Sequence, residues 1–237
     1  MKKAKKTIVV LSGAGVSAES GINTFRDTDG LWEGHDVMEV ASPQGFERNP
    51  ELVLNFYNER RRQLKEVEPN AAHTIIANLE EDFEVIVVTQ NVDDLHERAG
   101  STQVIHLHGE LKKVRSTVRP DLVLDWEEDC SLGDCCPNGD QLRPHIVWFG
   151  EAVPLLEAAA EVVAIADIII IVGTSLKVYP AAGLVGYALP GAQVFYVDPK
   201  PASNWELERT GNLRVIKEKA TVGMMEVRGL LDRSHSA

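Results

Sequence analysis

Five short apolar runs, all rich in β-branched residues, constrain the fold of this chain more than any other feature. Each run is nearly continuous rather than alternating, and turn residues bound it. Runs of this kind are typical of parallel strands that are buried on both faces of a sheet. We therefore expect five buried strands at Ile8–Leu11, Val85–Val88, Val104–Leu107, Ile168–Val172 and Val194–Val197.

Helical patterns lie between these runs, at Pro50–Lys65, Ala71–Leu79 and Pro154–Ala166. Strands that alternate with helices predict an α/β fold with a doubly wound, Rossmann-like parallel sheet. Such a sheet binds its ligands at the carboxyl ends of the strands.

Two regions interrupt the alternation and are expected to form a small second domain. Residues 25–70 are too long for a simple crossover and predict a helical insert. Residues 110–144 hold the cysteines and predict a small module. The discontinuous remainder would be the large domain: 1–24, 71–109 and 145–237.

A glycine-rich turn follows the first predicted strand. Gly13, Gly15 and Ala18 fit the pattern G-x-G-x-x-[G/A], in which backbone N–H groups approach a dinucleotide pyrophosphate at a helix N-terminus. The pattern is weak alone, because glycines also make ordinary tight turns. A second turn at Gly21 leads into Thr24–Asp27, where a dehydrogenase would still be helical.

Polar residues follow three of the predicted strands and would lie at one edge of the sheet. They are Gln90, Asn91 and Asp93, then Gly173, Thr174 and Ser175, and lastly Asp198. Such groups bond ribose and phosphate, although each set could instead cap a following helix. Three strand ends with nucleotide-type groups favour a nucleotide site.

His106 and His108 end the third predicted strand and would share one of its faces. A histidine at this edge is suited to general-base catalysis because its pKa is close to neutral pH. A buried structural histidine is at least as good an interpretation from spacing alone.

Tyr57 and Arg60 are three positions apart in a helical pattern and would share a face. A phenol and a guanidinium together can bind a carboxylate. From spacing alone a solvated surface is favoured, because Arg60–Arg62 form a run of charge.

Composition and cysteine spacing limit which partners and metals can be expected. The net charge of −12 argues against nucleic acid as the main partner. No run is long enough for a membrane helix, and three cysteines form no disulfide framework, so the cytoplasm is the expected compartment. Structural zinc normally needs four ligands, and the chain has only three thiols, those of Cys130, Cys135 and Cys136. Either a mixed site that also uses Asp or His, or no metal site, is therefore expected.

Taken together, five segments resemble the sirtuins, the family of NAD-dependent protein lysine deacylases. They are GAGVSAESGINTFR, TQNVDDLHERAG, HLHGE, RPHIVWFGE and IIIIVGTSLKVYPAAG, in the order of the family. Tyr57 and Arg60 match the Tyr-x-x-Arg of the class III, bacterial-type branch, which removes succinyl and malonyl groups. The resemblance therefore reverses the surface interpretation of this pair.

The resemblance implies an enzyme that consumes NAD and removes succinyl, malonyl and also acetyl groups from lysines of proteins or peptides, with the first two preferred. The expected products are nicotinamide and O-acyl-ADP-ribose. His108 would be the general base, with Asn91 also catalytic. Ala41, Tyr57, Arg60, Val147, Phe149, Gly150 and Glu151 would bind the substrate. The cofactor would contact Gly13, Ala14, Gly15, Glu19, Ser20, Gly21, Phe25, Arg26, Trp32, Gln90, Asn91, Asp93, Gly173, Thr174, Ser175, Val197, Asp198 and Ala220.

Two segments depart from the family pattern. Val114–Thr117 stands where the first cysteine pair of the family's zinc site would begin, so we expect no structural zinc. Packing of Leu122, Leu124, Trp126 and Leu142 would then hold the module together. Tyr196–Asp198 replaces an Asn-containing stretch and leaves the adenosine contacts open.

Other functions remain as alternatives. An NAD-dependent protein ADP-ribosyltransferase would use the same cofactor and the same histidine, His108. A hydride-transferring oxidoreductase is disfavoured, since no acidic residue ends a second strand about 20 positions after the glycines. A non-catalytic NAD sensor is disfavoured because Asn91 and His108 are both present. Oligomeric state and physiological substrates are left open.

Overall fold

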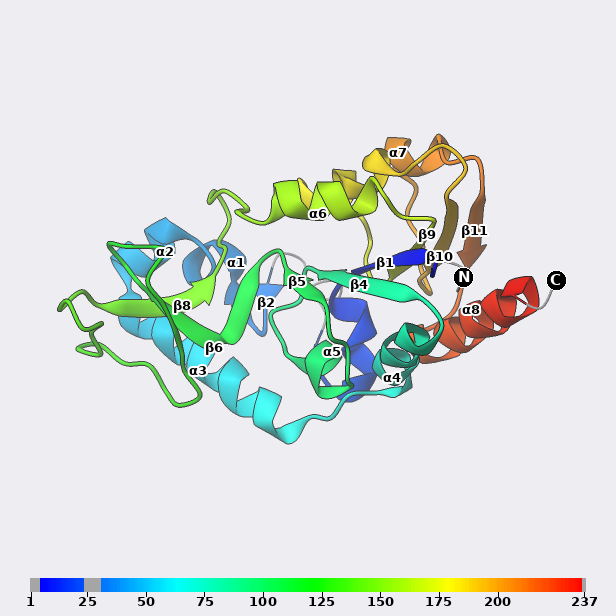
Figure 1. Cartoon of the computed structure of the whole chain (residues 1–237). Coiled ribbons are helices and arrows are strands. Elements are labelled where there is room, and N and C mark those ends of the chain that lie inside the picture. Colours follow the sequence, from blue (N-terminus) through cyan, green and yellow to red (C-terminus); the bar gives the residue numbers. More distant parts are fainter. Residues whose placement is uncertain (1–4, 24–30, 236–237) are drawn as a thin grey trace.

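The computed structural model describes residues 5–23 and 31–235, and all five expected runs form strands of one parallel sheet (Figure 1). A sixth strand, β11, extends the sheet at an edge where the sequence analysis expected none. The strands are β1 (Thr7–Ser12), β4 (Glu84–Thr89), β5 (Val104–His106), β9 (Ile168–Val172), β10 (Gln193–Val197) and β11 (Leu213–Ile216).

The strand order is β11-β10-β9-β1-β4-β5, so the chain reverses its direction of travel across the sheet beside β1. The first strand, β1, lies between β4 and β9, with Ile8 opposite both Val85 and Ile168. The loops that leave β1 and β9 separate at this point. A crevice therefore opens at their carboxyl ends, which is where a doubly wound sheet binds ligands.

Helices cover both faces of the sheet, which explains why the strands are apolar throughout. Ile8 and Val10 belong to the core under α4 (Ala71–Asn78) and α8 (Ala220–His235). Val9 and Leu11 belong to the opposite core, under α6 (Leu156–Val163) and the 3₁₀ helix η5 (Ala181–Tyr187). Shorter helices close the connections: η4 (Leu79–Glu81), α5 (Leu95–Arg98) and α7 (Trp205–Glu208).

The turn after β1 differs from the expected helix N-terminus. Two 3₁₀ turns, η1 (Ala14–Val16) and η2 (Ala18–Ser20), replace an α-helix, and Gly21 ends the second at φ 100°. The Gly15 N–H donates to the Gly173 carbonyl oxygen at 2.8 Å, so it bonds outside the turn. The helix expectation was wrong because contacts with the neighbouring strand end determine this turn.

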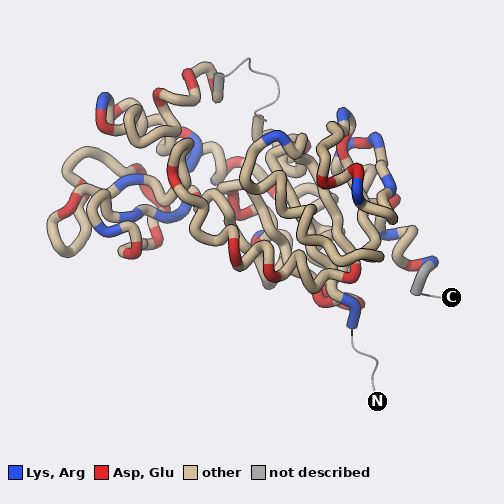
Figure 2. Tube along the Cα trace, turned by 90° about the horizontal axis from the view of Figure 1, so that it is seen from above, with Lys and Arg blue, Asp and Glu red and all other residues tan. Residues whose placement is uncertain are grey.

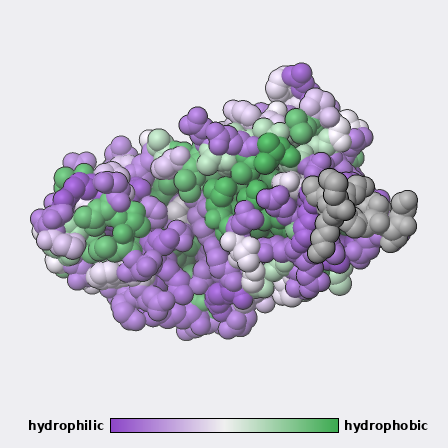
Figure 3. All heavy atoms as spheres, viewed as in Figure 1, coloured by the Kyte–Doolittle hydropathy of each residue, from purple (hydrophilic) through white to green (hydrophobic). Residues whose placement is uncertain are grey.

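Between residues 31 and 70, the region expected as a helical insert holds three α-helices and a two-stranded ribbon. Its elements are β2 (Leu31–Trp32), β3 (His35–Asp36), α1 (Val37–Val40), α2 (Pro43–Arg48) and α3 (Pro50–Glu66). Proline at the first position and a side-chain cap begin α2 and α3, where Ser42 and Asn49 accept from backbone N–H groups. The outer surface around α3 is hydrophilic (Figure 3).

The cysteine-containing module is an antiparallel sheet, ordered β7-β6-β8, that packs against α3. Its strands are β6 (Gly109–Ser116), β7 (Val123–Asp125) and β8 (Leu142–Ile146). Asn58 of α3 joins the two parts, since its amide donates to the Cys130 carbonyl oxygen and accepts from the Cys130 N–H. The trace thus shows a larger and a smaller lobe, with acidic and basic residues interspersed in both (Figure 2).

An apolar cluster fills the small lobe. Leu142, Val114 and Leu54 are buried in it with Cys130 and Cys136, and the other three residues expected to pack there also join it: Leu122, Leu124 and Trp126. Within residues 5–23 and 31–235, no three His, Cys, Asp or Glu side chains are gathered as a metal site.

A polar network lies beside this cluster. Asp140 accepts hydrogen bonds from Ser116 Oγ at 3.0 Å, from Arg119 Nε at 3.1 Å and from the Cys136 thiol at 3.5 Å. Ser116 belongs to the segment where the family would place its first cysteine pair. Hydrogen bonds and apolar contacts therefore occupy this part of the lobe. In the part of the chain that is described, no helix is long and apolar enough to cross a bilayer.

Candidate active site

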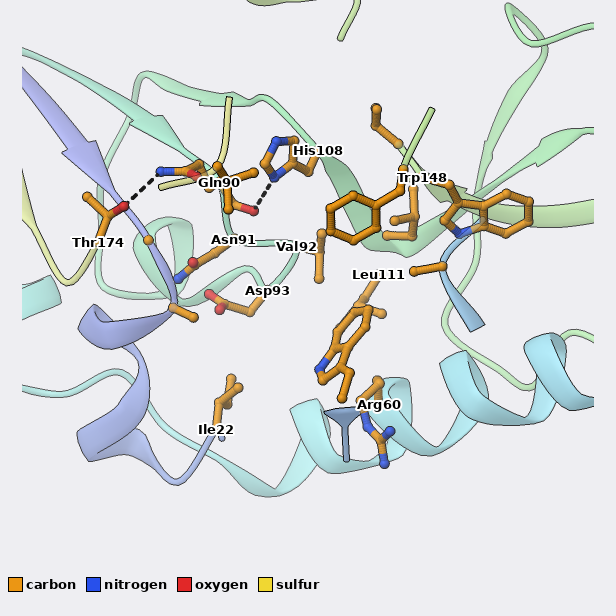
Figure 4. Close-up of a pocket in the computed structure, with 18 of the residues that line it drawn as sticks. Ile22, Arg60, Gln90, Asn91, Val92, Asp93, His108, Leu111, Trp148 and Thr174 are labelled. Atoms are coloured by element: carbon orange, nitrogen blue, oxygen red, sulfur yellow. Dashed lines mark hydrogen bonds between the residues drawn. The ribbon is translucent and has the colours of Figure 1, made fainter. Parts of the chain in front are cut away.

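A cavity lies between the carboxyl ends of the strands and the small lobe (Figure 4). Three loops of the sheet, helix α3 and the segment after β8 form its walls. In the close-up, His108 and Gln90 lie on one side of the cavity, and Arg60 comes from α3 on another. Most of the predicted site residues line it: Gly13, Ala14, Gly15, Trp32, Ala41, Tyr57, Arg60, Gln90, Asn91, Asp93, His108, Val147, Phe149, Gly150, Glu151, Gly173, Thr174 and Ser175.

Glycines allow the loops after β1 and β9 to touch. A Cβ on Gly15 would lie 2.7 Å from the Gly173 Cα, and a Cβ on Gly173 would lie 2.1 Å from the Val16 backbone nitrogen. Gly173 also has φ +65°, a left-handed conformation that favours glycine. The two loops therefore meet backbone to backbone and form one continuous wall of the cavity.

The loop after β4 places two amides and a carboxyl group at the cavity. Gln90 Nε2 donates to Thr174 Oγ1 at 3.2 Å, which links this loop to the loop after β9. Asn91 Nδ2 donates to Ser17 Oγ, and the Ser17 hydroxyl donates to Asp93 Oδ2, each at 3.0 Å. Burial raises the pKa of Asp93 to about 6, despite hydrogen bonds from Leu95 N–H and Ser17.

His108 has the tautomer that a general base needs. Its Nδ1 lies 3.1 Å from the Gln90 carbonyl oxygen, which can only accept, so Nδ1 carries the proton. The other nitrogen, Nε2, then has a free lone pair. Burial lowers the pKa of His108, against the opposing effect of the bond to Gln90, so the imidazole is neutral near pH 7. His108 can accept a proton from a bound hydroxyl group.

The two histidines of this segment do not share a face, contrary to the sequence-based expectation. Strand β5 ends at His106, and the chain turns at Leu107 and His108. Only His108 lines the cavity, whereas His106 is 8% exposed and bonds the Asn91 carbonyl oxygen and Glu97. The alternation that holds within a strand fails because the strand ends between them.

Arg60 brings unpaired donors to the opposite wall. Its Nε and Nη1 atoms are buried and have no hydrogen-bond partner among the described residues. Only Nη2 is paired, with Glu59 at 3.3 Å, and the guanidinium lies 4.6 Å from the centre of the Phe56 ring. Buried guanidinium groups normally donate hydrogen bonds to acceptors, so Arg60 is suited to bind an anionic group in this cavity.

The rest of the arginine run is not a solvated surface either. Arg61 is 1% exposed and donates to the Leu111 carbonyl oxygen and to Asn58 Oδ1. Only Arg62 faces outward, where it pairs with Asp129. The run therefore divides into a cavity residue, a structural residue and a surface residue.

Tyr57 lies beside Arg60 in a nest of aromatic rings. It is fully buried, and Trp148 Nε1 donates to its hydroxyl oxygen at 3.0 Å. Burial raises the pKa of Tyr57, so the phenol stays protonated. Sequence reasoning did not assign Trp148, which lines the cavity from within the RPHIVWFGE segment; its neighbours on both sides were the available signal.

Backbone hydrogen bonds hold the segment after β8 in place. Val147 N–H donates to the His108 carbonyl oxygen, and Phe149 N–H donates to that of Ala41, both at 2.9 Å. Glu151 was expected to bind substrate. Its carboxylate accepts hydrogen bonds from the guanidinium groups of Arg115 and Arg143 and from the Trp148 N–H. Glu151 therefore holds the cavity wall in place through ion pairs.

Several residues expected at the cofactor do not line this cavity. Glu19 accepts from Thr221 N–H and Oγ1 and so ties the glycine-rich turn to the start of α8. Asp198 is buried and accepts from Lys200 N–H. Phe25 and Arg26 lie outside the described residues. The remaining residues lie away from the lining: Ser20, Gly21, Val197 and Ala220.

A family model described as the Sir2 family matches residues 13–180. The chain belongs to the Sir2 family. It is 58% identical to an NAD-dependent protein deacylase of Helicobacter pylori (strain ATCC 700392 / 26695), over 94% of this chain and 96% of that relative. It is 51% identical to a Bacteroides thetaiotaomicron protein of the same name, over 95% and 98% of the two chains.

Solved structures agree with the sequence relatives. A Sir2 homologue mutant in complex with ADP-ribose has a TM-score of 0.87 and 39% identity, covering 98% of this chain and 94% of that chain. A Sir2 homologue–NAD complex has a TM-score of 0.85 at 39% identity, covering 97% and 91%. These similarities confirm the expected sirtuin fold and the expected class, an NAD-dependent protein deacylase.

Proposed function

We propose that this sirtuin removes succinyl and malonyl groups from lysine side chains in preference to acetyl groups. The supporting observation is that two buried nitrogens of Arg60 have no hydrogen-bond partner among residues 5–23 and 31–235, in the cavity that His108 also lines. Succinyl and malonyl groups end in a carboxylate, which a guanidinium binds through two parallel hydrogen bonds. An acetyl group offers no acceptor there and leaves the buried charge unpaired.

Tyr57 and Ala41 support the same preference. Because Trp148 Nε1–H occupies one lone pair of the Tyr57 oxygen, the phenol proton is left to donate to an acceptor. Ala41 lines the same cavity with only a methyl side chain, which leaves room for a longer acyl group. Tyr57, Arg60 and Ala41 thus form the proposed acyl pocket.

NAD is the proposed co-substrate, and the residues of the sheet edge fit it. The backbone at Ala14, the hydroxyls of Thr174 and Ser175, and the amides of Gln90 and Asn91 are groups that bind phosphates and riboses. The N–H groups of Gly13, Gly15 and Gly173 are bonded to backbone carbonyl oxygens instead, so these glycines bring the loops together. When bound, NAD supplies a ribose carbon that the acyl oxygen can attack. The expected products are nicotinamide, free lysine and an O-acyl-ADP-ribose.

The chain's own groups have defined roles in this scheme. His108 Nε2 takes a proton from a ribose hydroxyl, because its pKa is lowered and its Nδ1–H is bonded to Gln90. Asp93, held by Ser17 and Leu95 N–H, accepts the carboxamide N–H of the nicotinamide. Asn91 orders the same loop through Ser17. The acylated lysine would enter along Val147–Gly150.

One assay tests this proposal. Three peptides of identical sequence that carry acetyl-, succinyl- or malonyl-lysine are incubated with the protein and NAD, and all products are weighed by mass spectrometry. We expect stoichiometric nicotinamide and O-acyl-ADP-ribose, with higher kcat/KM for the two acidic acyl groups. Peptide that gains ADP-ribose would instead support the transferase alternative, and equal kcat/KM for all three would contradict the acyl preference.

Acylated proteins of the cytoplasm are the expected substrates.

A further inference from the structure

His106 lies behind the cavity wall and is not assigned to the reaction, yet both of its ring nitrogens bond the surroundings of the active site. Nδ1 lies 3.1 Å from the Asn91 carbonyl oxygen, and Nε2 lies 2.7 Å from Glu97 Oε1. The ring is almost fully buried, whereas Glu97 is partly exposed. These two contacts determine the charge of the ring.

Both partners of His106 are acceptors, so both ring nitrogens must carry protons. A carbonyl oxygen cannot donate, and an ionised carboxylate only accepts. A neutral imidazole has a single N–H and could satisfy one of the two partners. The remaining possibility, a protonated Glu97, is disfavoured: burial favours it, but the bond and charge of His106 outweigh burial and lower the pKa of Glu97.

The charged groups that face His106 favour the imidazolium. Glu97 on α5 and Glu110 on β6 are acidic, and Asp93 lies in the loop before α5. His96 on α5 is uncharged, since burial lowers its pKa to about 3. Lys113 faces Glu97 and is the opposing cation. Burial lowers the pKa of His106, but the bond and charge of Glu97 outweigh it and raise the pKa overall.

The bond to Asn91 fixes a peptide group in the catalytic loop. His108 Nδ1–H binds the Gln90 carbonyl oxygen, and His106 Nδ1–H binds the next carbonyl oxygen, that of Asn91. The Asn91 N–H is held by Thr89 Oγ1 at 3.0 Å. With both sides of its backbone fixed, the Asn91 side chain reaches Ser17, which in turn bonds Asp93.

We infer that His106, as an imidazolium held by Glu97, is a positioning residue that sets the loop Gln90–Asp93 for deacylation. When His106 loses a proton, its remaining N–H stays on the stronger acceptor, the Glu97 carboxylate. The Nδ1 lone pair then faces the lone pairs of the Asn91 carbonyl oxygen, and the peptide group turns away. Deacylation therefore falls as the pH rises through the pKa of His106.

The test is the pH profile of kcat/KM for Glu97→Gln, measured with the acyl-lysine peptide that the wild type turns over fastest. In this variant the glutamine amide can donate to Nε2 of a neutral His106, which then keeps its Nδ1–H on the Asn91 carbonyl oxygen, so the alkaline limb should be lost. Glu226→Gln is the matched control, because Glu226 is similarly exposed and pairs with Arg214 far from the site.

Histidine Cε1–H signals in NMR give a second, direct measurement. The His106 signal is the one missing from His106→Gln. It should titrate above pH 6.5 in the wild type and about 1–3 units lower in Glu97→Gln, because an opposite charge in direct contact raises the pKa of a histidine. An alkaline limb that is unmoved or absent in both proteins would overturn the inference. So would a His106 ring that is neutral at pH 7.

Discussion

At the scale of single residues, Arg60 allows the sharpest test of acyl selectivity. Arg60→Met removes the two unpaired buried nitrogens and keeps a long apolar side chain. We expect desuccinylation and demalonylation to fall about 10- to 100-fold in kcat/KM relative to deacetylation, the size of a charge-assisted hydrogen bond. Arg62→Met, two positions away but on the outer surface, is the control and should change neither activity. Equal losses on all three peptides would exclude Arg60 as a selectivity residue.

His108 is tested by removing its side chain and by varying the pH. His108→Ala should abolish deacylation and leave NAD binding, measured by calorimetry, largely intact. In the wild type the base works only when neutral, and burial lowers its pKa from 6.5. The acid limb of kcat/KM should therefore lie below pH 6.5, with activity rising as the pH rises through it. Measurable turnover by His108→Ala would remove the assigned role.

At the scale of elements, the small lobe is expected to be stable without a metal, through apolar packing and hydrogen bonds. Leu142 of β8 is fully buried among Leu54, Val114 and the two buried cysteines. Leu142→Ala should cost about 2–5 kcal/mol of unfolding free energy in urea denaturation, as large-to-small changes in cores do. Leu132→Ala is the control, because Leu132 is largely exposed. A chelator should not change the unfolding midpoint, and zinc well above trace amounts in purified protein would contradict this account.

The elements also show which parts of the fold could be predicted from the sequence. The five apolar strands were predictable because burial on both faces demands continuous β-branched runs. Strand β11 was missed because it lies at the edge of the sheet and reads LRVI, with two exposed residues. The two 3₁₀ turns and the buried Arg61 were also missed. Their bonding partners, Gly173 and the Leu111 carbonyl, come from distant parts of the chain, and residue spacing contains no such information.

The candidate site was predictable in its members but less so in its geometry. The motifs indicated Asn91, His108, Tyr57 and Arg60, and all four line one cavity. The sequence did not indicate that Glu151 would be enclosed by two arginines, nor that Trp148 would bond Tyr57. Those contacts depend on how the small lobe packs, and only three-dimensional contacts determine that.

At the scale of the whole molecule, Asp93 should lower stability as a consequence of its place in the site. Its pKa is 3.8 in an unfolded chain and about 6 when buried. Between these values the folded protein keeps a proton that the unfolded chain has lost, so stability falls as the pH rises. Asp93→Asn should therefore be more stable than the wild type at pH 8 by about 1–3 kcal/mol. At pH 4 the difference should nearly vanish. Urea unfolding at both pH values measures this, and an equal difference at both would contradict it.

The central position of β1 has a consequence for how this protein is made. β1 is synthesised before the other five strands of its sheet, yet it pairs with β4 and with β9, and Ile8 meets Ile168 only after more than half of residues 5–235 have been made. Until then one edge of β1, whose central residues Ile8–Leu11 are all apolar, has no partner strand. Long-range pairing of this kind folds slowly and exposes nascent chains to aggregation. Newly synthesised protein is therefore expected to depend on chaperones until β9 has emerged.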